Sequence, residues 1–243
     1  MSNTNPPTHP LNKFVDFDGV AQAPRWVIPG FIGHGVTVIS GAQGVGKTTA
    51  MLPLALVAAG LHGGELMPSH WRHVVYITED IEQARRILAG IVNHGNIGIT
   101  RESVQERIHI VEAVRLTPAF VAEVGKTYRE QFTRTVGEVA VLPLVVLDTK
   151  SAVLAVDDEN DNSKASAMMA ALKQGFDGLP VWLIGHVAKA SFGKSEGANL
   201  SSRGASAVEA DANQTMFLIA EGERRCLIQG KTGRCQASCR LRG

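Results

Sequence analysis

The chain has 243 residues, of which 44% are hydrophobic and 19% charged, and this composition excludes a wholly disordered protein. Lys and Arg number 24 and Asp and Glu number 23, so the formal net charge is only +1. The chain therefore lacks the overall positive charge that is typical of nucleic-acid-binding proteins. Any nucleic-acid contact must be local, or must be built by several subunits together.

The ends of the chain and its cysteines bear on its location. The first ten residues are polar and proline-rich, and the longest apolar run, residues 50–61, is too short to span a bilayer. The three cysteines are Cys226, Cys235 and Cys239, an odd number that favours a reducing compartment. Their spacing matches no standard zinc pattern, and their role is left open. We expect a cytoplasmic protein with no membrane contact.

The hydrophobic pattern divides the chain into three parts. Residues 1–24 have no periodic pattern and are predicted to be a flexible arm. Residues 231–243 carry four basic residues and no acidic one, and are predicted to be a basic, disordered tail. The segment between them, residues 25–230, is predicted to form one domain.

Apolar strands alternate with helical segments along this domain. Strands are expected at residues 26–28, 36–40, 74–78, 108–111, 144–147 and 181–184, with a final hairpin at 216–220 and 225–229. Helices are expected at residues 48–60, 82–92, 120–132 and 164–176. The last of these has Asn162 or Ser163 as its expected N-cap.

This alternation predicts an α/β fold with a mostly parallel central sheet flanked by helices and a C-terminal β-hairpin. The central strands are continuous apolar runs, which indicates that both faces of the sheet are covered. Ligands of such folds bind at the carboxyl ends of the strands. Glu79, Asp148 and His186 each lie at or just after the end of a strand, so we expect them at that edge.

Residues 41–48, Gly-Ala-Gln-Gly-Val-Gly-Lys-Thr, match the phosphate-loop pattern G-x-x-x-x-G-K-[ST] between a predicted strand and a predicted helix. The glycines let backbone N–H groups surround phosphate oxygens at the positive end of the helix dipole. Lys47 is expected to reach the β- and γ-phosphates, and Thr48 to bind Mg²⁺. The predicted ATP-binding residues are Gly41, Gln43, Gly44, Val45, Gly46, Lys47, Thr48 and Thr49.

Asp148 ends an apolar strand, as a Walker B aspartate does, and is predicted to hold Mg²⁺ together with Thr48. The next residues are Thr149 and Lys150, so the carboxylate that activates water must come from another strand. Glu79 follows the strand after the phosphate-loop helix and is the predicted general base. The neighbouring Asp80 is its rival for this role.

The chain resembles the RecA-like NTPases, and more narrowly the hexameric DnaB-type ATPases, especially plasmid RepA-type replicative helicases and their phage and mobile-element relatives. The resemblance rests on the following residues: 26–30 (Trp-Val-Ile-Pro-Gly), the phosphate loop, 76–80 (Tyr-Ile-Thr-Glu-Asp), 146–149 (Val-Leu-Asp-Thr) with 158–160 (Asp-Glu-Asn), and 186–189 followed by 202–207 (Ser-Arg-Gly-Ala-Ser-Ala). It implies that His186 senses the γ-phosphate. It also implies that Arg203 reaches the nucleotide of the neighbouring subunit.

The function implied is Mg²⁺-dependent ATP hydrolysis by a ring, expected to be a hexamer, that acts as a DNA helicase or replication ATPase on single-stranded DNA. Two loops, residues 150–161 and 188–202, are candidates for contacting DNA, and the acidity of the first favours the second. The alternative is an ATP-driven regulatory or recombinase-like DNA-binding switch that does not unwind. A small-molecule kinase is disfavoured because no cluster of arginines forms a lid.

Overall fold

The computed structural model describes residues 26–61, 64–94, 98–154, 161–187, 206–222 and 224–230. The predicted arm, the predicted tail and Arg203 lie outside the described residues, as do Cys235 and Cys239. Among the described residues, no helix has both the length and the apolar character that crossing a bilayer demands.

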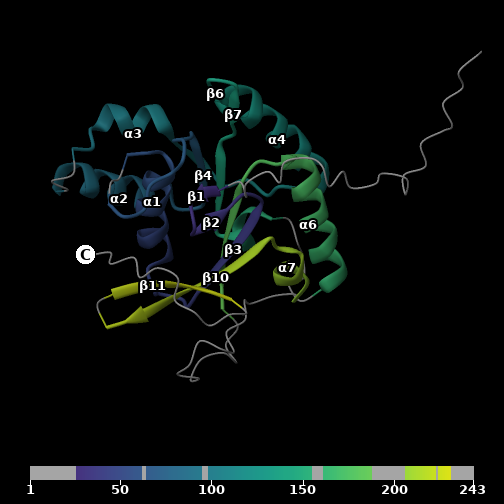
Figure 1. Cartoon of the computed structure of the whole chain (residues 1–243). Coiled ribbons are helices and arrows are strands. Elements are labelled where there is room, and N and C mark those ends of the chain that lie inside the picture. The colour runs from purple at the N-terminus through teal and green to yellow at the C-terminus, as the bar shows by residue number, and fades with distance from the viewer. Residues whose placement is uncertain are drawn as a thin grey trace, which may run out of the picture.

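A seven-stranded sheet organises the described part of the chain (Figure 1). Its strands are β3 (Val36–Gly41), β4 (Val74–Thr78), β5 (Ile108–Glu112), β8 (Leu144–Asp148), β9 (Val181–His186), β10 (Gln214–Glu221) and β11 (Arg224–Gln229). They are ordered β11-β10-β3-β9-β8-β4-β5, and every pair is parallel except the hairpin β10–β11. The predicted mostly parallel sheet and C-terminal hairpin are confirmed.

Helices cover both faces of this sheet. They are α1 (Lys47–Ala58), α2 (Ile81–His94), α3 (Arg101–Arg107), α4 (Pro118–Phe132), α5 (Lys150–Val153), α6 (Asn162–Phe176) and α7 (Ser206–Asp211). The first three contribute to one core and the other four to the core on the opposite face. Figure 1 shows α1, α2 and α3 on one side of the sheet and α4, α6 and α7 on the other. Strand β4 is buried between the two layers, since Tyr76 belongs to the first core and Val75 and Ile77 to the second.

Two short hairpins lie outside the central sheet. One is formed by β1 (Trp26–Ile28) and β2 (Ile32–Gly33), and the other by β6 (Arg134–Val136) and β7 (Val139–Val141). The second hairpin was not predicted, and neither were α3, α5 and α7. These elements are only three to seven residues long, too short for a hydrophobic period to distinguish them from loops.

The start of α6 corrects one expectation. The N-cap is Asp161, whose Oδ1 accepts hydrogen bonds from the backbone N–H groups of Ser163 and Lys164 at 2.9 and 3.1 Å. Asn162 and Ser163, the predicted caps, lie inside the helix. All of these residue types are good N-caps, so composition alone could not choose between them.

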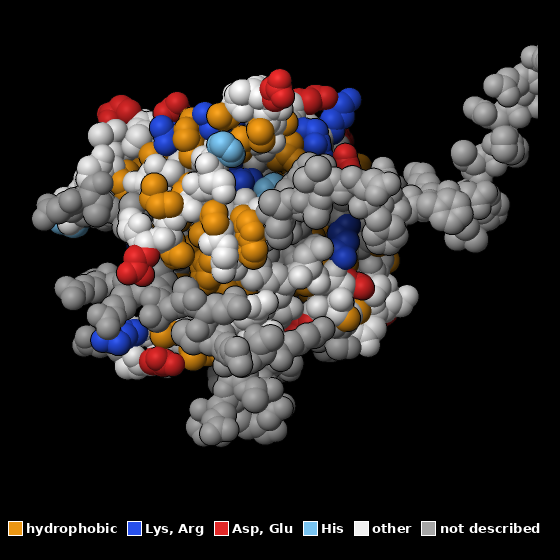
Figure 2. Space-filling model, in the orientation of Figure 1, with side chains coloured by type: hydrophobic (Ala, Val, Ile, Leu, Met, Phe, Trp, Pro, Cys, Tyr) orange, Lys and Arg blue, Asp and Glu red, His pale blue; other side chains and the backbone are white. Residues whose placement is uncertain are grey.

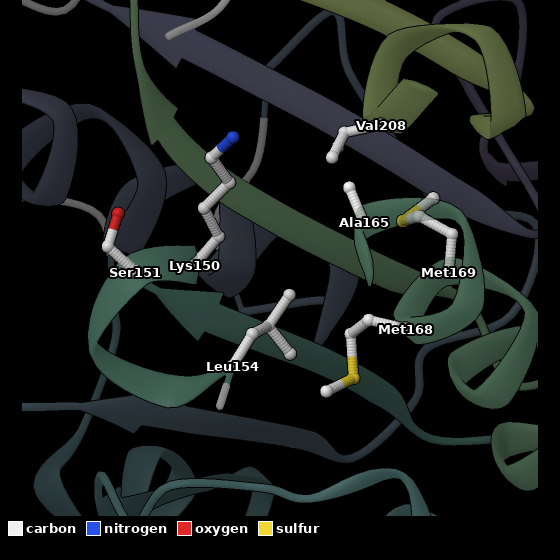
Figure 3. Close-up of a pocket in the computed structure, with 7 residues that line it drawn as sticks. All are labelled: Lys150, Ser151, Leu154, Ala165, Met168, Met169 and Val208. Atoms are coloured by element: carbon white, nitrogen blue, oxygen red, sulfur yellow. The ribbon is translucent and has the colours of Figure 1, made fainter. Parts of the chain in front are cut away.

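Lys150 and Ser151 begin helix α5, whereas the sequence placed them in a loop that was a candidate for contacting DNA. Lys150 is only 6% exposed. It lines a small apolar pocket together with Leu154 and with residues of α6 and α7 (Figure 3). Lys150 is therefore not a solvent-facing loop lysine, although residues 155–160 of that loop lie outside the described residues.

Charged side chains of both signs are scattered among hydrophobic ones on the face shown in Figure 2. This mixture agrees with the near-zero net charge of the chain. The described residues of that face therefore offer no broad basic surface to a DNA backbone.

Helices α4 and α6 cross at two glycines, Gly125 and Gly175. A Cβ atom on Gly125 would overlap the carbonyl oxygen of Gly175, and one on Gly175 would lie 2.8 Å from Cγ1 of Val121. The Gly125→Ala variant is expected to lower the free energy of unfolding by about 1–3 kcal/mol, because two packed helix backbones must separate. Urea denaturation measures this loss.

The control for this variant is Gly90→Ala. Gly90 lies in α2, and a Cβ atom there would have nothing within 4 Å. Alanine in a helix is favoured over glycine by about 0.5–1 kcal/mol, so this variant should be neutral or more stable. Equal loss of stability in both variants would contradict the close helix crossing.

Candidate active site

The phosphate loop connects β3 to α1 at the carboxyl edge of the sheet. Gly44 and Gly46 have positive φ angles of 76° and 84°, a backbone conformation that side chains disfavour. A Cβ atom on Gly41 would lie 2.9 Å from Cγ1 of Val45, whose side chain is buried beneath the loop. The loop is thus wrapped tightly over its own valine, and its last two residues, Lys47 and Thr48, already belong to α1.

The ammonium group of Lys47 is held at this loop. Its Nζ donates to the carbonyl oxygens of Ala42 at 3.0 Å and Gly41 at 3.4 Å, and lies 3.2 Å from Nδ1 of His186. Burial lowers the pKa of Lys47, and the negative charge of Asp148 opposes that shift. Phosphate oxygens would be stronger acceptors for this desolvated cation than the two carbonyls it now contacts.

Asp148 ends β8 and is only 3% exposed. Its Oδ2 accepts two short hydrogen bonds, from the hydroxyl of Thr48 at 2.8 Å and from the hydroxyl of Tyr76 at 2.6 Å. Burial raises the pKa of Tyr76 well above its usual value, and the charge and hydrogen bond of Asp148 raise it further. Tyr76 therefore remains a protonated donor that orients the carboxylate.

Tyr76 was not among the predicted site residues. The signal for it is the alternation of β4, because Thr78 is paired with Asp148 and Tyr76 lies two residues earlier on the same side of the strand. That signal depends on knowing that β4 and β8 are neighbours, which the sequence does not state.

Thr48 and Asp148 suit a bound Mg²⁺. Their oxygens are 2.8 Å apart, close to the roughly 2.9 Å that separates adjacent ligands in an octahedral magnesium shell. The described residues contain no cluster of three His, Cys, Asp or Glu side chains that could hold a metal by themselves. In nucleotide sites Mg²⁺ takes few protein ligands and completes its shell with phosphates and water.

His186 reaches the loop because β9 lies between β3 and β8, with His186 paired in register to Gly41. Position 185, directly before it, is glycine. A Cβ atom at Gly185 would lie 3.3 Å from Cε of the buried Lys150. A larger residue at position 185 would therefore require Lys150 to move.

Glu79 and Asp80 follow β4, and both are exposed. Asp80 acts as a helix cap, because its Oδ1 accepts the backbone N–H of Gln83 at 2.8 Å. In the described part of the chain, the carboxylate of Glu79 makes no hydrogen bond or ion pair. Thr78, the last residue of β4, is paired with Asp148 on β8. Glu79 is therefore one residue past the position on β4 that lies beside Asp148.

Two arginines, Arg203 and Arg225, also bear on the nucleotide site. Arg203, the predicted trans-acting residue, lies outside the described residues, as does the loop of residues 188–202. Arg225, which was not predicted, donates from Nε to the carbonyl oxygen of Val45 in the phosphate loop at 2.7 Å. This contact joins residues 180 positions apart, so no local motif could indicate it.

Solved structures share this fold at low sequence identity. A structure described as an ATPase domain matches with a TM-score of 0.54 and 13% identity, covering 82% of this chain and 78% of that chain. "The Structure Of A DnaB-Like Replicative Helicase And Its Interactions With Primase" matches with 0.55 and 14%, covering 80% and 51%. "Crystal structure of the RadB recombinase" matches with 0.52 and 16%, covering 89% and 84%. These likenesses show a RecA-like fold, and this chain spans about half of the DnaB-like helicase.

No curated protein matches the chain significantly. A protein-family profile described as "AAA domain" matches residues 4–191, which is well over half of the chain. That range includes the phosphate loop, Tyr76, Asp148 and His186. The chain therefore belongs to this AAA domain family, and it is a P-loop ATPase of the RecA-like kind.

Proposed function

We propose that this ATPase is the Mg²⁺-dependent motor of a homo-oligomeric ring, a hexamer, that acts on single-stranded DNA as a replicative helicase of a plasmid, phage or mobile element. Two contacts carry the proposal: Thr48 with Asp148, and Lys47 with His186. They join the phosphate loop, which follows β3, to the carboxyl ends of β8 and β9. The fold likeness to a DnaB-like replicative helicase supports the helicase role.

In this proposal the phosphate loop binds the triphosphate, and Lys47 leaves its loop carbonyls for the phosphate oxygens. Thr48 and Asp148 hold Mg²⁺, which when bound neutralises charge on the phosphates. Glu79 takes a proton from the attacking water as that water bonds to the γ-phosphorus. The bond from the γ-phosphorus to the bridging oxygen breaks, and ADP and inorganic phosphate result.

His186 is the proposed sensor of the γ-phosphate. Its Nδ1 lies 3.2 Å from the Lys47 ammonium, so a shift of Lys47 toward phosphate changes the partner of the imidazole. His186 also ends β9, and the chain continues from there into residues 188–202. This continuity offers a route from hydrolysis to the proposed DNA-contacting loop.

The alternative is a recombinase-like switch that binds DNA without unwinding it, and the likeness to the RadB recombinase favours this candidate. Both candidates use the same nucleotide site, so a measurement of ATP hydrolysis does not distinguish them. A strand-displacement assay on a forked duplex distinguishes them. The helicase requires ATP-dependent displacement, whereas a switch binds the fork and leaves it paired.

Substitution of Arg203 tests whether the subunits assemble into a ring with shared active sites. A finger arginine supplied by a neighbour stabilises charge on the transferred phosphoryl group and contributes about 10³-fold or more in rate. Specific ATPase activity should therefore rise with protein concentration as native mass increases, and rise again with single-stranded DNA. Arg203→Ala should bind ATP and remain slow at every concentration.

Mixing two inactive variants makes this test decisive. Arg203→Ala mixed with Lys47→Ala should regain part of the activity, because some interfaces combine an intact Lys47 with an intact Arg203. Mixtures shown to co-assemble but without regained activity would exclude action in trans, as would wild-type activity that does not depend on concentration.

A further inference from the structure

The C-terminal hairpin contacts the phosphate loop through one side chain. Arg225 lies on β11 opposite Ala220 of β10, and it is half-buried. Its Nε donates to the carbonyl oxygen of Val45 at 2.7 Å. Its Nη1 donates to the carbonyl oxygens of Arg224 at 3.1 Å and Gly222 at 3.3 Å, which anchor the guanidinium on its own hairpin.

The hydrogen bond to the Val45 carbonyl also affects the direction of the next backbone N–H group. It shares one planar trans peptide with the N–H of Gly46, and in such a peptide the C=O and N–H groups point in opposite directions. When Arg225 draws the Val45 oxygen to one side of the loop, the Gly46 N–H is directed to the other side. That N–H is one of the donors expected to surround the phosphates.

Arg225 also brings positive charge to the loop. A Cβ atom built on Gly46 would have Nε of Arg225 and Cβ of Thr49 each at 3.8 Å, so the guanidinium lies beside the start of α1. Within the described residues, no carboxylate pairs with Arg225, since its hydrogen bonds are all to carbonyl oxygens. No described carboxylate therefore neutralises its charge near the proposed phosphate-binding loop.

We infer that Arg225 is a positioning residue of the nucleotide site, which fixes the phosphate loop in its phosphate-binding form and ties it to the C-terminal hairpin. The inference rests on nucleotide binding at the phosphate loop and needs neither a ring nor DNA. A loop organised in advance loses less conformational freedom when a ligand binds. Because the Val45 contact does not depend on the γ-phosphate, Arg225 supports ADP and ATP alike.

The test is MgADP binding by isothermal titration calorimetry to the full chain and four variants. Arg225→Ala and Arg225→Met remove the guanidinium, and Arg225→Lys keeps a charged donor. Loss of a charge-assisted hydrogen bond predicts a rise of about 10-fold in the Kd of MgADP for the alanine and methionine variants, and a smaller rise for lysine. Arg224→Ala is the matched control, because Arg224 is the neighbouring exposed arginine of β11.

A second readout separates positioning from general damage. The Arg225 variants should raise KM for ATP and leave kcat within about 2-fold, the pattern of lost binding that is equal in ground and transition states. Amide hydrogen exchange should also slow in β11 when MgADP binds to wild type, and slow less in Arg225→Met, because coupling between two sites is reciprocal.

Several results would overturn the inference. One is a Kd for Arg225→Met equal to that of Arg224→Ala, and another is a Kd for Arg225→Lys as weak as that for Arg225→Met. If Arg225→Ala does not fold, the comparison of lysine with methionine still decides. Failure of wild type itself to bind MgADP would count against the nucleotide site, and therefore against the proposed function as well.

Discussion

The Lys47→Ala variant is expected to lose ATP hydrolysis by about 10³-fold or more and to bind nucleotide weakly, while it keeps its fold. Lys47 holds its ammonium group against the carbonyl oxygens of Gly41 and Ala42 in the phosphate loop. Its partial desolvation strengthens its electrostatic attraction to phosphate oxygens, and a water molecule in its place carries no charge. ATP turnover and MgADP titration measure the two losses, and thermal unfolding reports the fold.

Lys164→Ala provides the control, since Lys164 is an exposed lysine on α6, on the opposite face of the sheet from α1. It should hydrolyse ATP at the wild-type rate. Near-normal ATP hydrolysis by folded Lys47→Ala would show that the phosphate loop is not the catalytic nucleotide site.

The Glu79→Gln variant is expected to bind Mg²⁺ and ATP normally and to hydrolyse ATP at least about 10²-fold more slowly, the scale of a lost general base. The reason is positional. Glu79 follows the residue paired with Asp148, and its carboxylate has no other partner among the described residues. Glutamine keeps the shape of the side chain and removes its ability to accept a proton. Single-turnover hydrolysis with bound nucleotide separates chemistry from binding.

Asp80→Asn is both the control and the rival. Asparagine is as good an N-cap as aspartate, so this substitution preserves the hydrogen bond to Gln83 that begins α2. Only the proton-accepting capacity of position 80 changes. If Asp80→Asn slows hydrolysis about 10²-fold and Glu79→Gln does not, Asp80 is the general base.

The sequence by itself determined the features that depend on neighbouring residues. The phosphate loop is recognisable because the glycines, Lys47 and Thr48 act within eight consecutive positions between a strand and a helix. Asp148 and His186 were identifiable as strand-end residues because continuous apolar runs mark buried parallel strands. The same runs were sufficient to predict the α/β fold and the C-terminal hairpin.

Tertiary structure decided what depends on the order of the strands. Hydrophobic periodicity shows that a strand exists, but it carries no information about which strand lies beside it. The contact of Tyr76 with Asp148 requires β4 beside β8, and that of Arg225 with Val45 requires the terminal hairpin to pack beside β3. Likewise, Lys150 looks like a loop lysine in the sequence, and only the packing of α5 against β9 and α6 buries it. Such contacts join residues 72 and 180 positions apart, which is why the fold had to be known before they could be found.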